Sequence, residues 1–223
     1  MTNIADNLKD VQAKIAKRAD KWGQDASRVE LVAVSKKQPV EKLRAALEAG
    51  QRVFGENRVQ EAQQKWPALR EEYEGISLHL IGPLQTNKAK EAIALFDVIE
   101  TVDRPKLARI LSNEMEKQGR QIPVYIQVNI GAEDQKAGIP IEEADDFIKS
   151  CRDELKLDVK GLMCIPPAEE QPAPYFALLG KIAARNGLDH LSMGMSGDFE
   201  YAVQYGATSV RVGTGIFGAR EEG

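Results

Sequence analysis

Two stretches near the C-terminus combine the residue types that bind a phosphate group. Residues 191–197 read LSMGMSG and residues 210–218 read VRVGTGIFG, so each is a short apolar segment that runs into glycines and hydroxyl side chains. Backbone N–H groups at helix N-termini bind an anion without a lysine, because they are unpaired donors at the positive end of a dipole. Far upstream, residues 31–36 read LVAVSK, a strand-like segment that ends in the amine of Lys36. An amine that faces a phosphate site could hold a phosphorylated aldehyde.

Each candidate side chain also has a purely structural interpretation. Lys36 could be a surface lysine at the start of a loop. Ser196 could cap a helix and Thr214 could belong to a turn, although both roles are compatible with a phosphate contact. Asn57 could likewise cap a helix, and His79 could be a buried histidine with satisfied hydrogen bonds.

Arg211 is harder to explain by structure alone, because it lies inside an otherwise apolar strand-like segment. Side chains alternate between the two faces of a strand, so Val210 and Val212 share the face toward the helices and Arg211 points into the interior. A buried guanidinium must find acceptors. The glycines at 194, 197, 213 and 215 fit a close approach of the backbone to a ligand, although tight turns use glycine too.

Eight strand-like segments alternate with helix-like segments along the chain. We predict strands at 31–35, 52–55, 77–81, 98–101, 124–129, 159–163, 190–193 and 209–212. Proline and glycine mark helix ends: Pro39 and Gly50 bound one helix, and Pro105 and Gly119 bound another. Ahead of the strands, apolar residues at 4, 8, 11, 15, 19 and 22 predict an amphipathic helix that packs on the body of the protein.

Strands separated by helices indicate a parallel sheet, and eight such units can close into a barrel. A doubly wound open sheet is the alternative, but no Gly-x-Gly-x-x-Gly turn follows the first strand. We therefore predict an α/β fold: a single (β/α)8 TIM barrel over residues 1–223 with an extra N-terminal helix. In such barrels phosphate usually binds after strands seven and eight, which is where the two glycine-rich stretches fall.

Composition excludes several classes of function. The chain has 223 residues, a formal net charge of −4 and no apolar run of the length that spans a bilayer. We therefore expect neither a nucleic-acid partner nor a membrane partner. Cys151 and Cys164 lack metal-ligand spacing, so we expect two buried, reduced cysteines and no metal. The N-terminal segment resembles no secretory or mitochondrial leader, and we expect a cytoplasmic protein.

The motifs together resemble one known family, the pyridoxal phosphate homeostasis proteins, which are similar to the barrel domain of alanine racemase standing alone. The matching segments follow family order over nearly the whole chain: AVSK at 33–36, FGEN at 54–57, HLIGPLQTNK at 79–88, QVN at 127–129, GLM at 161–163, LSMGMS at 191–196 and RVGTGIFG at 211–218. Two positions depart from the family pattern, Gly197-Asp198 after Ser196 and Gly215 where alanine is common. Both changes keep the site small.

The resemblance implies a fold-type III site for pyridoxal 5′-phosphate, held as a Schiff base, a covalent aldimine on Lys36. Ser196, Gly213, Thr214 and adjoining backbone N–H groups would then hold the phosphate. Arg211 would face the pyridine nitrogen. The cofactor-binding residues implied in this way are Lys36, Asn57, His79, Met163, Ser196, Gly197, Arg211, Gly213 and Thr214, and no catalytic residue is assigned.

The same resemblance argues against strong catalysis. An arginine cannot accept a hydrogen bond, so it keeps the ring nitrogen unprotonated, and an unprotonated pyridine is a weaker electron sink. Alanine racemase adds a tyrosine base from a second domain across a dimer, and we expect no such domain in this chain. We therefore expect a monomeric, non-enzymatic protein that buffers or delivers pyridoxal phosphate, with pyridoxal-phosphate-dependent apo-enzymes as partners, and that contributes to amino-acid and vitamin B6 balance.

Two alternatives stay open from the sequence. The first is a pyridoxal-phosphate-dependent racemase or isomerase that uses Lys36 as one base and His79 or a tyrosine as the other. The second keeps the barrel but changes the ligand, as a Schiff-base aldolase acting on a sugar phosphate. The aldolase hypothesis leaves Arg211 without a role and places the reactive lysine on an unusual strand.

Overall fold

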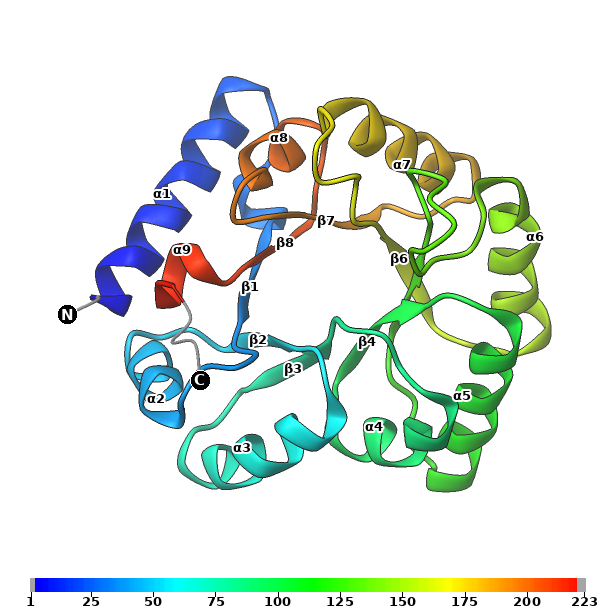
Figure 1. Ribbon diagram of the computed structural model, residues 1–223, viewed down its shortest axis with the longest axis horizontal. Coiled ribbons are helices and arrows are strands. Elements are labelled where there is room, and N and C mark those ends of the chain that lie inside the picture. Colours follow the sequence, from blue (N-terminus) through cyan, green and yellow to red (C-terminus); the bar gives the residue numbers. More distant parts are fainter. Residues whose placement is uncertain (1–2, 220–223) are drawn as a thin grey trace.

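A computed structural model describes residues 3–219 of the chain. Over that range, eight parallel strands pair in chain order and close on themselves through β8 and β1 (Figure 1). The predicted TIM barrel is confirmed, and each predicted strand is present with ends that differ by at most two residues. The strands are Glu30–Val34 (β1), Val53–Glu56 (β2), Ser77–Leu80 (β3), Val98–Val102 (β4), Val124–Gln127 (β5), Val159–Met163 (β6), His190–Met195 (β7) and Ser209–Val212 (β8).

Helices surround the strands on the outside of the barrel (Figure 1). They are Ile4–Lys21 (α1), Val40–Glu48 (α2), Val59–Glu72 (α3), Ala89–Leu95 (α4), Pro105–Gln118 (α5), Ala144–Lys149 (α6), Ala173–Arg185 (α7), Phe199–Gln204 (α8) and Thr214–Phe217 (α9). Short 3-10 turns cover Ala26–Arg28, Thr86–Lys88 and Ile141–Glu143, and a π turn covers Ser150–Glu154. As predicted, Pro105 lies at the start of α5, and Gly119 ends that helix in the left-handed conformation that favours glycine.

Helix α1 is the extra N-terminal helix that the sequence predicts. Asn3 caps it by accepting a hydrogen bond from the backbone N–H of Asp6 (3.2 Å). Its apolar stripe from Ile4 to Ala19 is buried, but Trp22 follows the helix and is 47% exposed, so its inclusion in the stripe was wrong. The helix contacts α2, α8 and α9, which follow β1, β7 and β8. It therefore covers the barrel where the last strand meets the first.

The alternation of side chains divides the barrel into two environments. Between the strands and the helices the core is apolar, with Leu31, Ala33, Val210 and Val212 among its members. The opposite faces of the strands point into the barrel, where buried polar groups gather, including Arg211 at 3% exposure. Among residues 3–219, no helix is long and apolar enough to cross a membrane.

Candidate functional site

Lys36 lies just beyond the C-terminal end of β1. Val34 pairs with Gly55 of β2, and Ala33 pairs with Val212 of β8, so Lys36 is at the same edge of the barrel as the ends of both neighbouring strands. It is half-buried, whereas Lys37 is exposed. The carboxyl ends of parallel strands are where barrel enzymes place their reactive groups, and Lys36 has that position.

The two glycine-rich turns lie side by side at this edge. The hydroxyl oxygen of Ser196 accepts hydrogen bonds from the backbone N–H groups of Gly213 (3.2 Å) and Gly215 (3.4 Å). Thr214 and Gly197 are exposed. Helix α8 begins after Asp198, so Ser196 is not its cap and its hydroxyl links the turn after β7 to the turn after β8. The structure therefore joins the two stretches that the sequence assigns to phosphate binding.

Small residues allow these turns to approach β1 and α8. A Cβ at Gly213 would be 3.3 Å from the Cβ of Val34, so the end of β8 lies against the end of β1. Gly194 has a φ of 94°, and a Cβ there would be 2.5 Å from the Cβ of Ala202. Only glycine fits at the point where β7 turns toward Ser196. By contrast, a Cβ at Gly197 would meet no atom within 4 Å.

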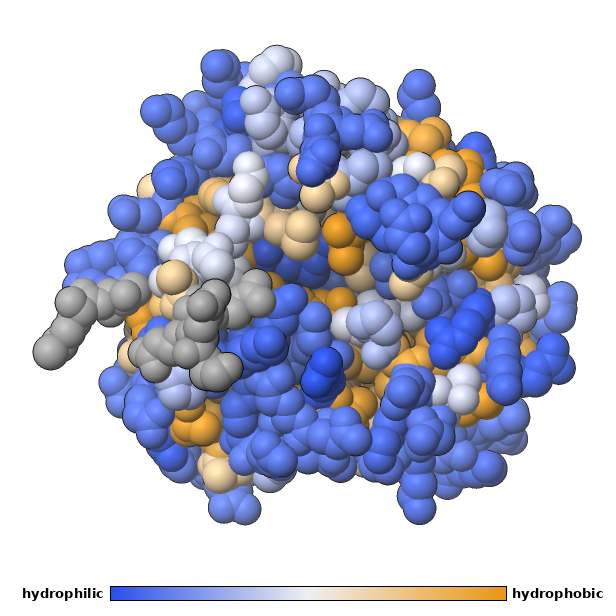
Figure 2. All heavy atoms as spheres, viewed as in Figure 1, coloured by the Kyte–Doolittle hydropathy of each residue, from blue (hydrophilic) through white to orange (hydrophobic). Residues whose placement is uncertain are grey.

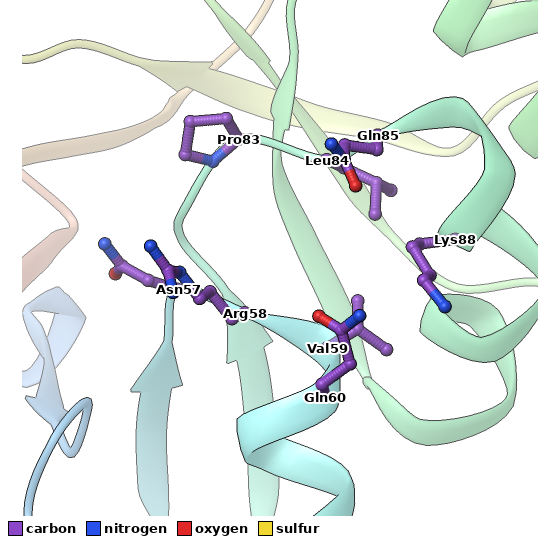
Figure 3. A pocket seen from close by; sticks show the side chains of 8 residues that line it. All are labelled: Asn57, Arg58, Val59, Gln60, Pro83, Leu84, Gln85 and Lys88. Atoms are coloured by element: carbon purple, nitrogen blue, oxygen red, sulfur yellow. The ribbon is translucent and has the colours of Figure 1, made fainter.

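Asn57 follows β2 and borders a hollow of about 470 Å³ at the edge of the barrel. Arg58, Gln85 and Lys88 also line this hollow, and Figure 3 shows Pro83 to Gln85 opposite the start of α3. A Cβ at Gly82 would be 2.3 Å from the backbone oxygen of Asn57, so this glycine lets the loops after β2 and β3 pack together. In the view down the barrel, hydrophilic and hydrophobic surface lie side by side around the centre (Figure 2).

Arg211 is directed into the barrel, as strand alternation predicts. Its Nη1 donates to the hydroxyl oxygen of Ser192 (2.6 Å), and its Nη2 donates to the backbone oxygen of Cys164 (2.9 Å). Ser192 in turn donates to Glu100, a fully buried carboxylate on β4. The other oxygen of Glu100 is 2.7 Å from Nδ1 of His79. A continuous polar chain therefore connects Arg211 to His79 through the inside of the barrel.

His79 lies away from the edge that carries Lys36, in contrast to the expectation that it lines the cofactor pocket. On β3 the inward positions are 77 and 79, and Ile81 directly after the strand continues that face, so Ile81 is nearest that edge and His79 lies one layer below. Its Nε2 is 3.2 Å from the hydroxyl oxygen of Ser77, and it borders a cavity of about 560 Å³ with Glu30 and Tyr125. That cavity is at the opposite, N-terminal ends of the strands.

Met163 lies near the edge that carries Lys36. It ends β6, is fully buried and pairs with Gln127 and Ser192 of the neighbouring strands. The two cysteines are both buried and free, as expected, and burial raises the pKa of each thiol to about 12. Among residues 3–219, no cluster of histidine, cysteine and acidic side chains could hold a metal ion.

Glu100 and Ser192, which hold Arg211 in place, were not predicted from the sequence. The signal was available, because Glu100 lies within the apolar strand 98–102 on the same face as Val98. Burial alone would raise the pKa of Glu100, but the hydrogen bond and charge of His79 and the charge of Arg211 hold it below its ordinary value. Burial alone would lower the pKa of His79, but Glu100 holds it above its ordinary value of 6.5. The contact between Glu100 and His79 therefore favours the ionised form of each.

The free energy of unfolding should depend on pH through His79. Because its pKa is raised on folding, its stabilising contribution is complete below the unfolded value and is lost as pH rises through the folded value. We expect the free energy of unfolding from urea titrations to fall between about pH 6.5 and the raised pKa. His79→Gln should flatten this part of the profile, while His190→Gln, which changes the half-exposed second histidine, should not. A profile unchanged by His79→Gln would contradict the expectation.

Comparison with known proteins adds three findings. Residues 3–221 match the family model described as alanine racemase, N-terminal domain. The pyridoxal phosphate homeostasis protein of Escherichia coli (strain K12) is 39% identical over 230 residues, which cover 99% of this chain and 98% of that protein. PipY of Synechococcus elongatus PCC7942 with pyridoxal phosphate bound has a TM-score of 0.83 at 34% identity, over 96% of this chain and 100% of that one.

Alanine racemase of Clostridium difficile 630 is a more distant match. It has a TM-score of 0.75 at 14% identity, over 99% of this chain and 57% of the racemase chain. At this identity the similarity concerns the fold alone.

Proposed function

The chain belongs to the family of pyridoxal phosphate homeostasis proteins, and from this membership we propose that it binds pyridoxal 5′-phosphate covalently through Lys36 to keep the supply of that cofactor in balance. One observation carries the proposal: Lys36 and the linked turns of Ser196 and Gly213 lie at the same edge of the barrel. These are the two kinds of group that a phosphorylated aldehyde needs. The proposed binding domain is the whole chain, residues 1–223.

The residues present fit the cofactor. Backbone N–H groups at Gly197 and Thr214, with the Ser196 hydroxyl, are donors suited to a phosphate, and open space around Gly197 leaves room for it. The N–H of Gly213 donates to Ser196 and so holds that hydroxyl beside the turn after β8. Arg211 uses two donor atoms on Ser192 and Cys164, and a guanidinium has five N–H groups, so it retains donors for the ring nitrogen. We place Asn57 and Met163 beside the ring, and we do not place His79 in direct contact with it.

We further propose that the protein does not catalyse amino-acid chemistry at an enzymatic rate. When bound, pyridoxal phosphate supplies an electron sink for carbanions, but an arginine at the ring nitrogen keeps that sink weak. Racemisation also needs a second base opposite Lys36. His79, which the sequence offered for that role, borders the cavity at the other end of the strands, and so does Tyr125, a buried tyrosine of β5, so neither supports a base at the Lys36 edge. Burial also raises the pKa of Tyr125.

Incubation of the purified protein with pyridoxal phosphate, followed by borohydride reduction and peptide mass spectrometry, tests the binding proposal. We expect one cofactor fixed per chain, on the peptide that contains Lys36. The same loaded protein, mixed with a panel of L-amino acids, should turn over more slowly than about 1 per second, the low end of ordinary enzyme rates. Absence of fixed cofactor would contradict the binding proposal, and faster racemisation would favour the racemase alternative.

We also propose that the protein delivers its bound cofactor to other proteins. A monomeric, cytoplasmic carrier would release pyridoxal phosphate to apo-enzymes that depend on it. The loaded protein should therefore reactivate such an apo-enzyme in a sample from which unbound cofactor has been removed. Sedimentation of the purified protein tests the monomer.

A further inference from the structure

Three charged side chains form a cluster directly behind Lys36. Glu56, the last residue of β2, is fully buried, and Lys65 of α3 is 8% exposed. Nζ of Lys65 is 2.7 Å from Oε1 of Glu56 and 2.9 Å from Oε1 of Glu61, which lies one turn earlier on α3. We call Glu56, Glu61 and Lys65 the Lys65 cluster.

The cluster holds the chain on both sides of Lys36. On the N-terminal side, Lys65 donates to the backbone oxygen of Ser35 (2.9 Å), and the Ser35 hydroxyl donates to Glu56 (2.7 Å). On the C-terminal side, the backbone N–H of Lys37 donates to Glu61. Two residues that flank Lys36 are therefore tied to β2 and α3 through the same ion pairs.

The backbone at Lys37 supports a positioning role. Its φ of 56° is in the left-handed region, which costs a residue with a side chain of the order of 1 kcal/mol. Such a conformation persists only where the surroundings enforce it, and the hydrogen bond from Lys37 to Glu61 does so here. The turn separates the directions of the two consecutive lysines, because Lys36 is half-buried at the barrel edge while Lys37 is exposed.

Stability alone does not account for the cluster. A buried ion pair often contributes no more than an apolar pair of the same size, because both charges lose water. Burial raises the pKa of Glu56, against the opposing charge of Lys65, and one carboxylate oxygen of Glu56 has no hydrogen-bond partner. The cluster nevertheless aligns three separate points of contact on residues 35–37. Its geometry therefore favours a function for that short segment.

We propose that the Lys65 cluster is a positioning device that fixes the direction in which Lys36 leaves the end of β1, so that its amine meets the aldehyde of a phosphate-anchored ligand. This inference rests on the proposed function of Lys36. Glu61 is the positioning residue that can be tested most cleanly, because it lies at the surface of α3 and its side chain is 26% exposed. A misplacement of about 1 Å can slow a reaction about 100-fold.

The test compares Glu61→Ala, Glu61→Gln and the control Glu71→Ala, which removes the same charge from an exposed position on the same helix. The measured quantity is the rate at which pyridoxal phosphate with cyanoborohydride labels Lys36 in folded protein. We expect Glu61→Ala to be about tenfold slower, as loss of a charge-assisted hydrogen bond implies. Glu61→Gln keeps an oxygen for the Lys37 N–H, so it should stay within about threefold of the wild type, and Glu71→Ala should be unchanged.

A second readout does not use the cofactor. Reductive methylation with formaldehyde labels Lys36 and Lys37 in the same peptide, and Glu61→Ala should raise the Lys36 to Lys37 ratio at least about twofold as Lys36 becomes more accessible. Equal pyridoxal phosphate labelling rates in Glu61→Ala and wild type would overturn the positioning role. Failure of the wild type to take up pyridoxal phosphate would instead overturn the proposed function. In that case an unchanged methylation ratio would overturn the positioning role as well.

Discussion

Replacing Lys36 with alanine is expected to abolish borohydride-fixable pyridoxal phosphate and to weaken its binding by at least about 100-fold, while the barrel stays folded. The amine is the group we assign to the covalent bond, so the variant keeps only the proposed non-covalent contacts, those of Ser196 and Thr214 with the phosphate and of Arg211 with the ring. Lys36 follows β1 and lies outside the apolar core, so its loss leaves the packing of the strands intact. Equilibrium dialysis, reduction and mass spectrometry measure both effects.

The neighbouring lysine provides the matched control. Lys37→Asn removes a charge one residue away, and asparagine tolerates the left-handed backbone that Lys37 adopts. This variant should retain wild-type labelling of Lys36, since the Lys37 side chain is exposed and the backbone N–H that donates to Glu61 is kept. Wild-type amounts of fixed cofactor in Lys36→Ala would contradict the assignment, because another amine would then have to carry it.

Local patterns predicted the parts of the site that depend on strand order. The alternation of side chains along residues 209–212 was sufficient to predict that Arg211 points inward. The glycines and hydroxyl residues were sufficient to predict the turns after β7 and β8. These predictions succeed because a parallel barrel gathers all its strand ends at one edge. The position of Lys36 at the end of β1 follows from the same rule.

Contacts between side chains on distant elements could not be predicted from the sequence. Glu100 is on β4 and Ser192 on β7, so their meeting with Arg211 depends on side chains that cross the barrel interior. The distance of His79 from the C-terminal edge of the barrel depends on which inward-facing layer of side chains lies nearest that edge. The pattern of one strand does not identify that layer. Lys65 resembles any helical surface lysine in sequence, yet it is buried because Glu56, Glu61 and Ser35 surround its ammonium group.

Loss of Arg211 from the buried polar chain that connects it to His79 should strongly reduce the stability of the barrel. Arg211→Met is expected to lower the free energy of unfolding by about 3–5 kcal/mol, the usual result of removing one partner of a buried charged pair. Methionine fills similar space, so the loss would come mainly from charge rather than from a cavity. Glu100 would remain fully buried, with Ser192 as a neutral donor and His79 as its remaining ring partner. Urea unfolding of the cofactor-free protein at neutral pH measures the change.

A second substitution distinguishes electrostatics from packing. In the double variant Arg211→Met with Glu100→Gln, the amide can still hydrogen-bond to Ser192 and His79 but carries no buried charge. It should therefore be more stable than Arg211→Met alone by at least about 1 kcal/mol, a coupling typical of residues in one network. Additive losses from the two substitutions would contradict an ionic network. An ionic network of this kind explains why the interior of the barrel contains a buried glutamate. The carboxylate of Glu100 keeps the guanidinium of Arg211 buried and directed toward the proposed cofactor.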